Sequence, residues 1–182
     1  KVFRFDLLRK LLAFSLPLVP ASVLVFISLY INRFMINEII GIQSVGIYSV
    51  GVKIASVTGL IIVGFQMAIT PLIYKHYNDQ ETPKNLAIIF KYFVAIYSLF
   101  FISFSFLSKE LVLLLTTEEF FGISSIIPIL TLTFLFSNIY VFMPGIVIKK
   151  KTHIIFFINL VVAILNIILN LILIPKFNII GA

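Results

Sequence analysis

Three long runs without a charged side chain constrain this chain more than any other feature. They cover residues 11–31, 123–148 and 154–174. An α-helix rises about 1.5 Å per residue, so about 20 apolar residues are enough to cross the hydrocarbon core of a bilayer. A soluble fold cannot easily bury runs of this length, and hydrophobic residues make up 61% of the chain. The sequence therefore predicts an all-α integral membrane protein.

Two further apolar stretches complete the predicted set of spans. One of them contains Lys53 and four glycines, and the other carries Lys91 near its start. The prediction is a polytopic helical bundle with about five transmembrane helices, at residues 11–31, 45–73, 86–107, 123–148 and 154–174. Because the chain has no cysteine, disulfides, thiolate metal sites and cysteine nucleophiles are excluded.

The basic residues alternate between rich and poor segments along these spans. The regions at and around the successive span ends contain four, one, three, one, three and one of them, in chain order: Lys1, Arg4, Arg9 and Lys10; Arg33; Lys75, Lys84 and Lys91; Lys109; Lys149, Lys150 and Lys151; Lys176. Short loops rich in Lys and Arg stay on the cytoplasmic side of a membrane. The pattern predicts a cytoplasmic residue 1 side, and it explains the net charge of +7 without a nucleic-acid partner.

Two cations are candidates for binding an anion. Lys53 falls inside the second predicted span, and Arg33 lies at the outer end of the first. A cation at such a depth is costly unless it snorkels, pairs with a neighbour or faces water. Two interpretations stay open, namely a snorkelling or interhelically paired lysine and a contact with a phosphate group of a substrate.

Asparagines, small residues and prolines mark three of the predicted spans. Asn159, Asn166 and Asn170 lie at offsets of 7 and 4, so they form one stripe. That stripe predicts either interhelical hydrogen bonds or the lining of a polar transport path. The stripe Gly51, Ala55 and Gly59 predicts close helix packing. Pro17 and Pro20 predict a kink, or a hinge or cavity wall, in the first span.

Catalytic signatures do not occur in the sequence. It contains no Gly-rich phosphate loop, nucleophile elbow or zinc motif. All seven carboxylates fall at predicted span ends or in loops, so the chain has no obvious ion-coupling site inside the bilayer. We therefore expect no enzymatic activity, no catalytic residue, no metal site and no cofactor.

Four segments of the chain together resemble a known family. They are residues 14–20 (FSLPLVP), 32–53 (NRFMINEIIGIQSVGIYSVGVK), 150–153 (KKTH) and 166–182 (NIILNLILIPKFNIIGA). The chain resembles the C-terminal half of the polysaccharide-export flippases, the O-antigen and capsule-repeat flippases of the multidrug/oligosaccharidyl-lipid/polysaccharide superfamily. We also expect it to be a piece of a longer polytopic protein.

The resemblance implies a two-lobe transporter of which residues 1–182 form part of one lobe. It implies translocation of undecaprenyl-diphosphate-linked oligosaccharide repeat units, used in O-antigen and lipopolysaccharide synthesis, across the bacterial inner membrane by alternating access. The expected partners are the lipid-linked oligosaccharide, membrane lipid and the remaining lobe. The hypothesis for substrate binding names Lys53, Arg33, Asn166 and Asn170. Relatives often carry Asp-Arg where this chain has Asn32-Arg33, which removes one possible ion-pair partner of the arginine.

Besides a non-transporting scaffold, two other functions remain open at this point. One is a drug or metabolite antiporter of the same superfamily, which would need an acidic residue inside the membrane in the other lobe. The other is a membrane-embedded polymerase or acyltransferase of envelope synthesis, which would need catalytic residues in a large loop. The predicted loops are short, so the flippase interpretation is favoured.

Overall fold

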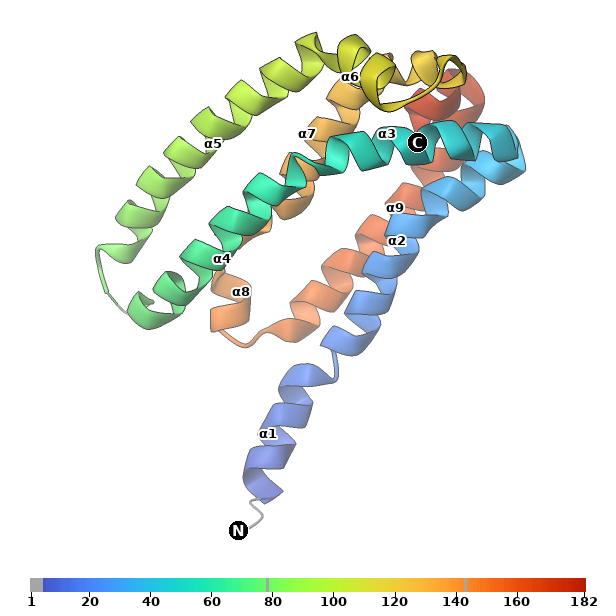
Figure 1. Ribbon diagram of the computed structural model, residues 1–182. Coiled ribbons are helices and arrows are strands. Elements are labelled where there is room, and N and C mark those ends of the chain that lie inside the picture. The colour runs from blue at the N-terminus through green and yellow to red at the C-terminus, as the bar shows by residue number, and fades with distance from the viewer. Residues whose placement is uncertain (1–4, 78, 143) are drawn as a thin grey trace. The chain divides into compact units, whose positions relative to one another are not determined.

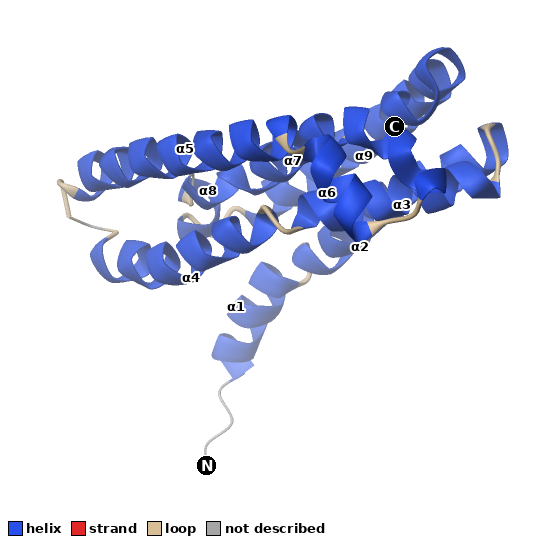
Figure 2. Cartoon of the chain, turned by 45° about the horizontal axis from the view of Figure 1, so that its top comes forward, coloured by secondary structure: helices blue, strands red, loops and turns tan. Residues whose placement is uncertain are grey.

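The structure is a computed structural model that describes residues 5–77, 79–142 and 144–182, so Lys1 and Arg4 of the basic pattern lie outside the described part. The described residues form helices joined by short connections, without a strand (Figures 1 and 2). Within this part, four helical segments are long and apolar enough to span a membrane, and a bent pair of helices is a fifth candidate. The prediction of an all-α, multi-span bundle is confirmed.

The chain divides into two compact units, which we describe separately. Unit 1 contains Lys1–Gly41 and Gly145–Ala182, and unit 2 contains Ile42–Pro144. Nine of the fourteen basic residues and two of the seven carboxylates belong to unit 1. The whole formal charge of +7 therefore belongs to unit 1, and unit 2 is neutral.

Unit 1 is built around two parallel helices, α2 (Leu18–Ile39) and α9 (Thr152–Phe177). Its other elements are α1 (Phe5–Ser15), α8 (Gly145–Ile148) and the 3-10 helix η3 (Asn178–Gly181), which returns against α9. The buried residues of α9 are Thr152, Ala163, Asn170 and Ile174. The buried side of α9 is thus the predicted polar stripe, while most of its large apolar side chains are exposed.

The two prolines lie where a short turn interrupts one candidate span, Phe5–Ile39. The first predicted span, residues 11–31, corresponds to α1 and α2 with a turn at Leu16 and Pro17 between them. Pro17 is the N-cap of α2, and Pro20 lies in its first turn. Amide groups in the first turn have no partner within their helix, so a proline there removes no hydrogen bond.

Unit 2 packs four α-helices and two 3-10 helices around α7 (Ile127–Asn138), which contacts most of these elements. These are α3 (Ile42–Ser56), α4 (Gly59–His76), α5 (Thr82–Phe106), α6 (Ser108–Leu115) and the 3-10 helices η1 (Glu118–Ser125) and η2 (Ile139–Phe142). The core near α3 comprises Ile54, Val112, Ile123 and Ile127.

Gly51 sets the closest approach between α3 and its neighbours. A Cβ atom added at Gly51 would lie 3.0 Å from Ile123 Cγ2 and 3.2 Å from Leu130 Cδ1. Ala55 is fully buried one turn later, and a Cβ at Gly59 would lie 3.6 Å from the ring of Phe134. The small-residue stripe therefore packs against η1 and α7, as its spacing predicted.

A break divides the second predicted span, residues 45–73. Its two helices, α3 and α4, meet at Val57 and Thr58 with a bend of 44°. The amides of Val57 and Thr58 bond the carbonyls three residues earlier, at 3.3 and 3.1 Å. The Ser56 hydroxyl donates to the Lys53 carbonyl at 2.7 Å. Short-range bonds and hydroxyl groups thus satisfy backbone that the break would otherwise leave without partners.

The surface of the described residues carries many large, exposed apolar side chains, more than a soluble protein usually shows. Side chains with half or more of their area exposed include Phe26, Leu72, Leu99, Phe106 and Val161. Monomeric soluble proteins rarely expose contiguous apolar surface on this scale, because burying it is favourable. Together with the candidate spans, this surface identifies a multi-pass membrane protein.

The orientation of the spans can be tested with single cysteines, because the chain has none of its own. The charge pattern places Gln80 and His153 on the cytoplasmic side and Gln43 and Thr117 outside, and all four side chains are exposed. In intact cells, a membrane-impermeant thiol reagent should label cysteines at Gln43 and Thr117 and leave those at Gln80 and His153 unlabelled until the membrane is opened. The opposite labelling would overturn the predicted orientation.

Candidate functional site

The four predicted substrate-binding residues belong to different units. Arg33, Asn166 and Asn170 lie in unit 1, and Lys53 lies in unit 2. Three of them therefore lie in one compact unit, and the surroundings of Lys53 are described separately.

An asparagine network joins α2 to α9 within unit 1. The Nδ2 group of Asn170 donates to Oδ1 of Asn32 at 2.8 Å and to Oδ1 of Asn166 at 3.1 Å. The Nδ2 group of Asn32 donates in turn to the carbonyl of Ala182 at 2.9 Å. Asn170 is 2% exposed. The network thus links α2, α9 and the segment after η3.

The asparagine stripe of α9 faces α2, and it forms interhelical hydrogen bonds there. At its other end, Asn159 Nδ2 lies 3.5 Å from the carbonyl of Ala21, which makes a long bond. Of the two interpretations of the stripe, interhelical bonding is the one that these contacts support. Both amide hydrogens of Asn170 are used within unit 1, so a role of Asn166 and Asn170 in substrate binding stays a prediction.

Asn32, which is not among the predicted site residues, is the partner of the asparagine stripe on α2. A signal for it existed, because Ala21, Ser28 and Asn32 repeat the offsets of 7 and 4 that relate Asn159, Asn166 and Asn170. Two parallel helices with equal spacing place such residues opposite one another. Both observed contacts, from residue 21 to 159 and from residue 32 to 170, keep the same offset of 138 residues.

Arg33 follows Asn32 on α2 and is half-buried. Its guanidinium carbon lies 5.5 Å from the centroid of the Tyr30 ring. A guanidinium over an aromatic face is attracted by the ring quadrupole, and it keeps its donors at the edges of its plane. The ring of Tyr30 therefore helps to hold the guanidinium group of Arg33 beside α2.

Lys53 is exposed in the last turn of α3, four residues before Val57, the first residue of the break. Among the described residues, no carboxylate forms an ion pair with Lys53, whereas Lys84 pairs with Glu81 at 3.7 Å. An exposed ammonium group without a protein counter-ion retains its attraction for a mobile anion. This exposure fits both the anion-contact hypothesis and a snorkelling lysine, so the role of Lys53 stays a prediction.

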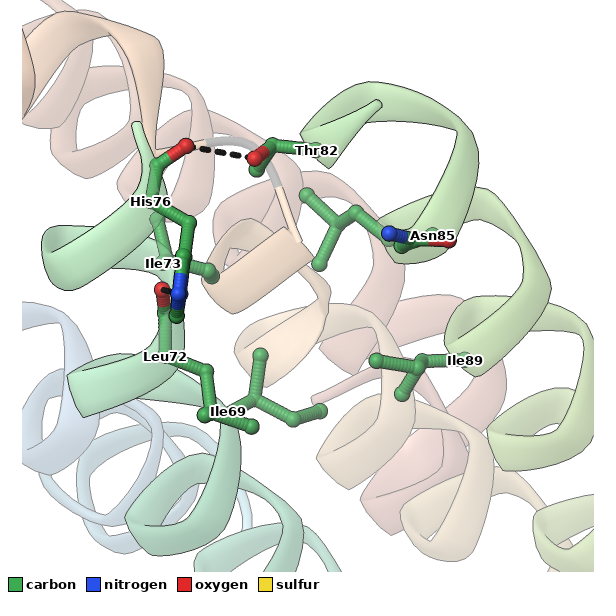
Figure 3. Close-up of a pocket in the computed structure, with 8 residues that line it drawn as sticks. Ile69, Leu72, Ile73, His76, Thr82, Asn85 and Ile89 are labelled. Carbon is green, nitrogen blue, oxygen red and sulfur yellow. Dashed lines mark hydrogen bonds between the residues drawn. The ribbon is translucent and has the colours of Figure 1, made fainter. Parts of the chain in front are cut away.

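A cavity of about 180 Å³ between α4 and α5 contains none of the predicted site residues. Its lining is mainly apolar, with Ile69, Ile73 and Ile89 among the side chains shown in Figure 3. At its polar end the Thr82 hydroxyl donates to the carbonyl of His76 at 2.5 Å. The lining offers few polar groups, and the side chains of His76 and Thr82 already bond backbone carbonyls, so the cavity offers little to a sugar headgroup.

Comparison with protein families found one matching segment. A family model described as polysaccharide biosynthesis protein matches residues 1–77. Comparison with curated proteins and with solved structures found no match. The predicted resemblance to a polysaccharide family is thereby confirmed over these residues, while the assignment to its C-terminal half stays a prediction. The matched segment extends from α1 through α4 and includes both Arg33 and Lys53.

Proposed function

We propose that this chain is part of a flippase that moves undecaprenyl-diphosphate-linked oligosaccharide repeat units across the bacterial inner membrane by alternating access. The observation that carries the proposal is the match of residues 1–77 to polysaccharide biosynthesis proteins. It is supported by the apolar, multi-span architecture, which suits a substrate with a lipid tail.

The proposed mechanism separates the two parts of the substrate. The polyprenyl tail stays in the bilayer, where apolar helix surface already meets lipid, and the diphosphate and sugars pass through a polar cavity shared with the remaining lobe. No covalent bond of the substrate is made or broken, so the protein is a transporter without a cofactor. Rocking of two lobes around a central site is the usual form of alternating access.

In this mechanism Lys53 contacts the diphosphate, and Arg33 assists near the outer mouth of the transport path. A diphosphate carries several negative charges, and charge-assisted hydrogen bonds from Lys or Arg are roughly twice as strong as neutral ones. The lower dielectric of a partly dehydrated cavity strengthens this attraction further. Lys53 supplies an exposed ammonium group from α3, and Arg33 supplies a guanidinium from α2.

Substitution of Lys53 tests the proposal in a strain that depends on this protein for surface glycan. Lys53→Arg should retain part of the glycan display, whereas Lys53→Gln, Lys53→Leu and Arg33→Gln should lose most of it at normal membrane levels. In the Lys53→Leu strain, unpolymerised lipid-linked repeat units should accumulate on the cytoplasmic leaflet, inaccessible to glycan-modifying reagents outside the inner membrane.

A matched control is Lys91→Leu, because Lys91 is also an exposed lysine in an apolar helix but lies near the predicted cytoplasmic end. It should display glycan normally. Full display by a well-expressed Lys53→Leu protein would exclude this lysine as a substrate contact. Accumulation of repeat units on the outer leaflet instead would favour a polymerase.

A further inference from the structure

The break between α3 and α4 lies beside a buried cluster of hydroxyl groups in unit 2. Thr58, within the break, donates its hydroxyl to the Ala55 carbonyl at 2.7 Å. The same oxygen lies 3.2 Å from the hydroxyl of Tyr97 on α5. Tyr97 donates to the carbonyl of Thr131 on α7 at 2.6 Å. None of these side chains is more than 1% exposed.

Thr58 and Tyr97 take part in three close oxygen–oxygen contacts but have only two hydroxyl protons between them, so one contact at a time lacks a hydrogen bond. Tyr97 has one hydroxyl proton, which the short contact assigns to the Thr131 carbonyl. Thr58 also has one proton, with two acceptors in reach, the Ala55 carbonyl and the Tyr97 oxygen. Thr58 can therefore turn its proton from the α3 backbone to α5 while Tyr97 keeps its bond to α7.

Aromatic packing fixes the ring of Tyr97 independently of its hydroxyl. Its centroid lies 5.9 Å from that of Phe93, which packs in turn against Phe65 of α4 at 5.1 Å and Phe142 of η2 at 4.9 Å. A phenylalanine at position 97 would preserve these contacts. The hydroxyl can thus be removed without removing the ring, which separates hydrogen bonding from packing.

We infer that Thr58, Tyr97 and Thr131 form a hydroxyl latch that sets the angle between α3 and α4. Because Lys53 lies in the last turn of α3, the latch also determines where its ammonium group is held. Thr58 and Tyr97 are then positioning residues for Lys53, a role that rests on the proposed function of that lysine. In apolar surroundings a hydroxyl has no water to replace a lost partner, so these bonds hold the break in one geometry.

The latch can be tested by measuring the distance between α3 and α4 in the membrane-reconstituted protein. Spin labels on cysteines at Gln43 and Leu72, both exposed, report this distance by pulsed electron resonance. Tyr97→Phe and Thr58→Val should each broaden or shift the distance distribution, and Thr58→Ser should restore it. Loss of one buried hydrogen bond should change the ratio of latched to unlatched molecules about five- to tenfold.

The matched control is Thr133→Val on α7, whose hydroxyl bonds the Ile129 carbonyl of its own helix. It should leave the distribution unchanged. An unaltered distribution in both Tyr97→Phe and Thr58→Val would overturn the latch, whatever Lys53 does.

Glycan display separates the two parts of the inference. A changed distance distribution with reduced display in Tyr97→Phe, at normal membrane levels, supports the positioning role. A changed distribution with full display would overturn that role. If Lys53→Leu displays glycan normally while the distribution still changes in Tyr97→Phe, the proposed contact of Lys53 fails and the latch itself stands.

Discussion

Replacing Gly51 with leucine is expected to lower the thermal stability of the detergent-solubilised protein by several degrees. Even a Cβ atom at this position would lie 3.0 Å from Ile123 and 3.2 Å from Leu130, so a leucine must push α3 away from η1 and α7. Overpacking of this kind costs about 1–3 kcal/mol of the free energy of unfolding. Each kcal/mol corresponds to a shift of about 2–4 °C in the midpoint of a domain of this size.

The control for this prediction is Gly46→Leu on the same helix. No atom lies within 4 Å of a Cβ at Gly46, so leucine there should leave the unfolding midpoint nearly unchanged. Gly51→Ala should have an intermediate effect, because only side-chain atoms must move by a few tenths of an ångström. Equal midpoints for the Gly46 and Gly51 leucine variants would contradict the close packing of α3.

The second large effect is expected at Asn170. Asn170→Leu removes the donor of two hydrogen bonds and leaves Oδ1 of Asn32 facing an apolar side chain at the α2–α9 contact. Hydrogen bonds between membrane helices contribute about 0.6–2 kcal/mol each, so we expect a loss of about 1–3 kcal/mol. This loss can be measured by thermal unfolding of the detergent-solubilised protein, in which the fraction of folded protein is recorded as the temperature rises.

Asn159→Leu is the matched substitution on the same stripe. Its one bond to α2 is long, at 3.5 Å, so its loss should be clearly smaller than that of Asn170→Leu. If the two variants lose the same stability, the network around Asn32 contributes no more than a single weak contact. If neither loses any, the asparagine stripe does not hold α2 against α9.

Local composition decided the class of this protein before any tertiary contact was known. The uncharged runs and the spacing of Gly51, Ala55 and Gly59 predicted apolar spans and a packing face, and both were found. These features are readable in sequence because burial in lipid and helical periodicity depend on the chain's own residues. The basic residues likewise predict an orientation, which the labelling experiment tests.

Only the tertiary structure could show which residues far apart in the sequence contact each other. The offsets of 7 and 4 were present in both α2 and α9, but periodicity says which residues share a face and not which helix that face meets. The parallel register that brings Asn32 to Asn170 therefore had to be observed. For the same reason the break at Val57 and Thr58 could not be predicted, because its buried partner Tyr97 lies 39 residues after Thr58 in the chain. Thr131, whose carbonyl accepts the Tyr97 hydroxyl, lies still farther along the chain.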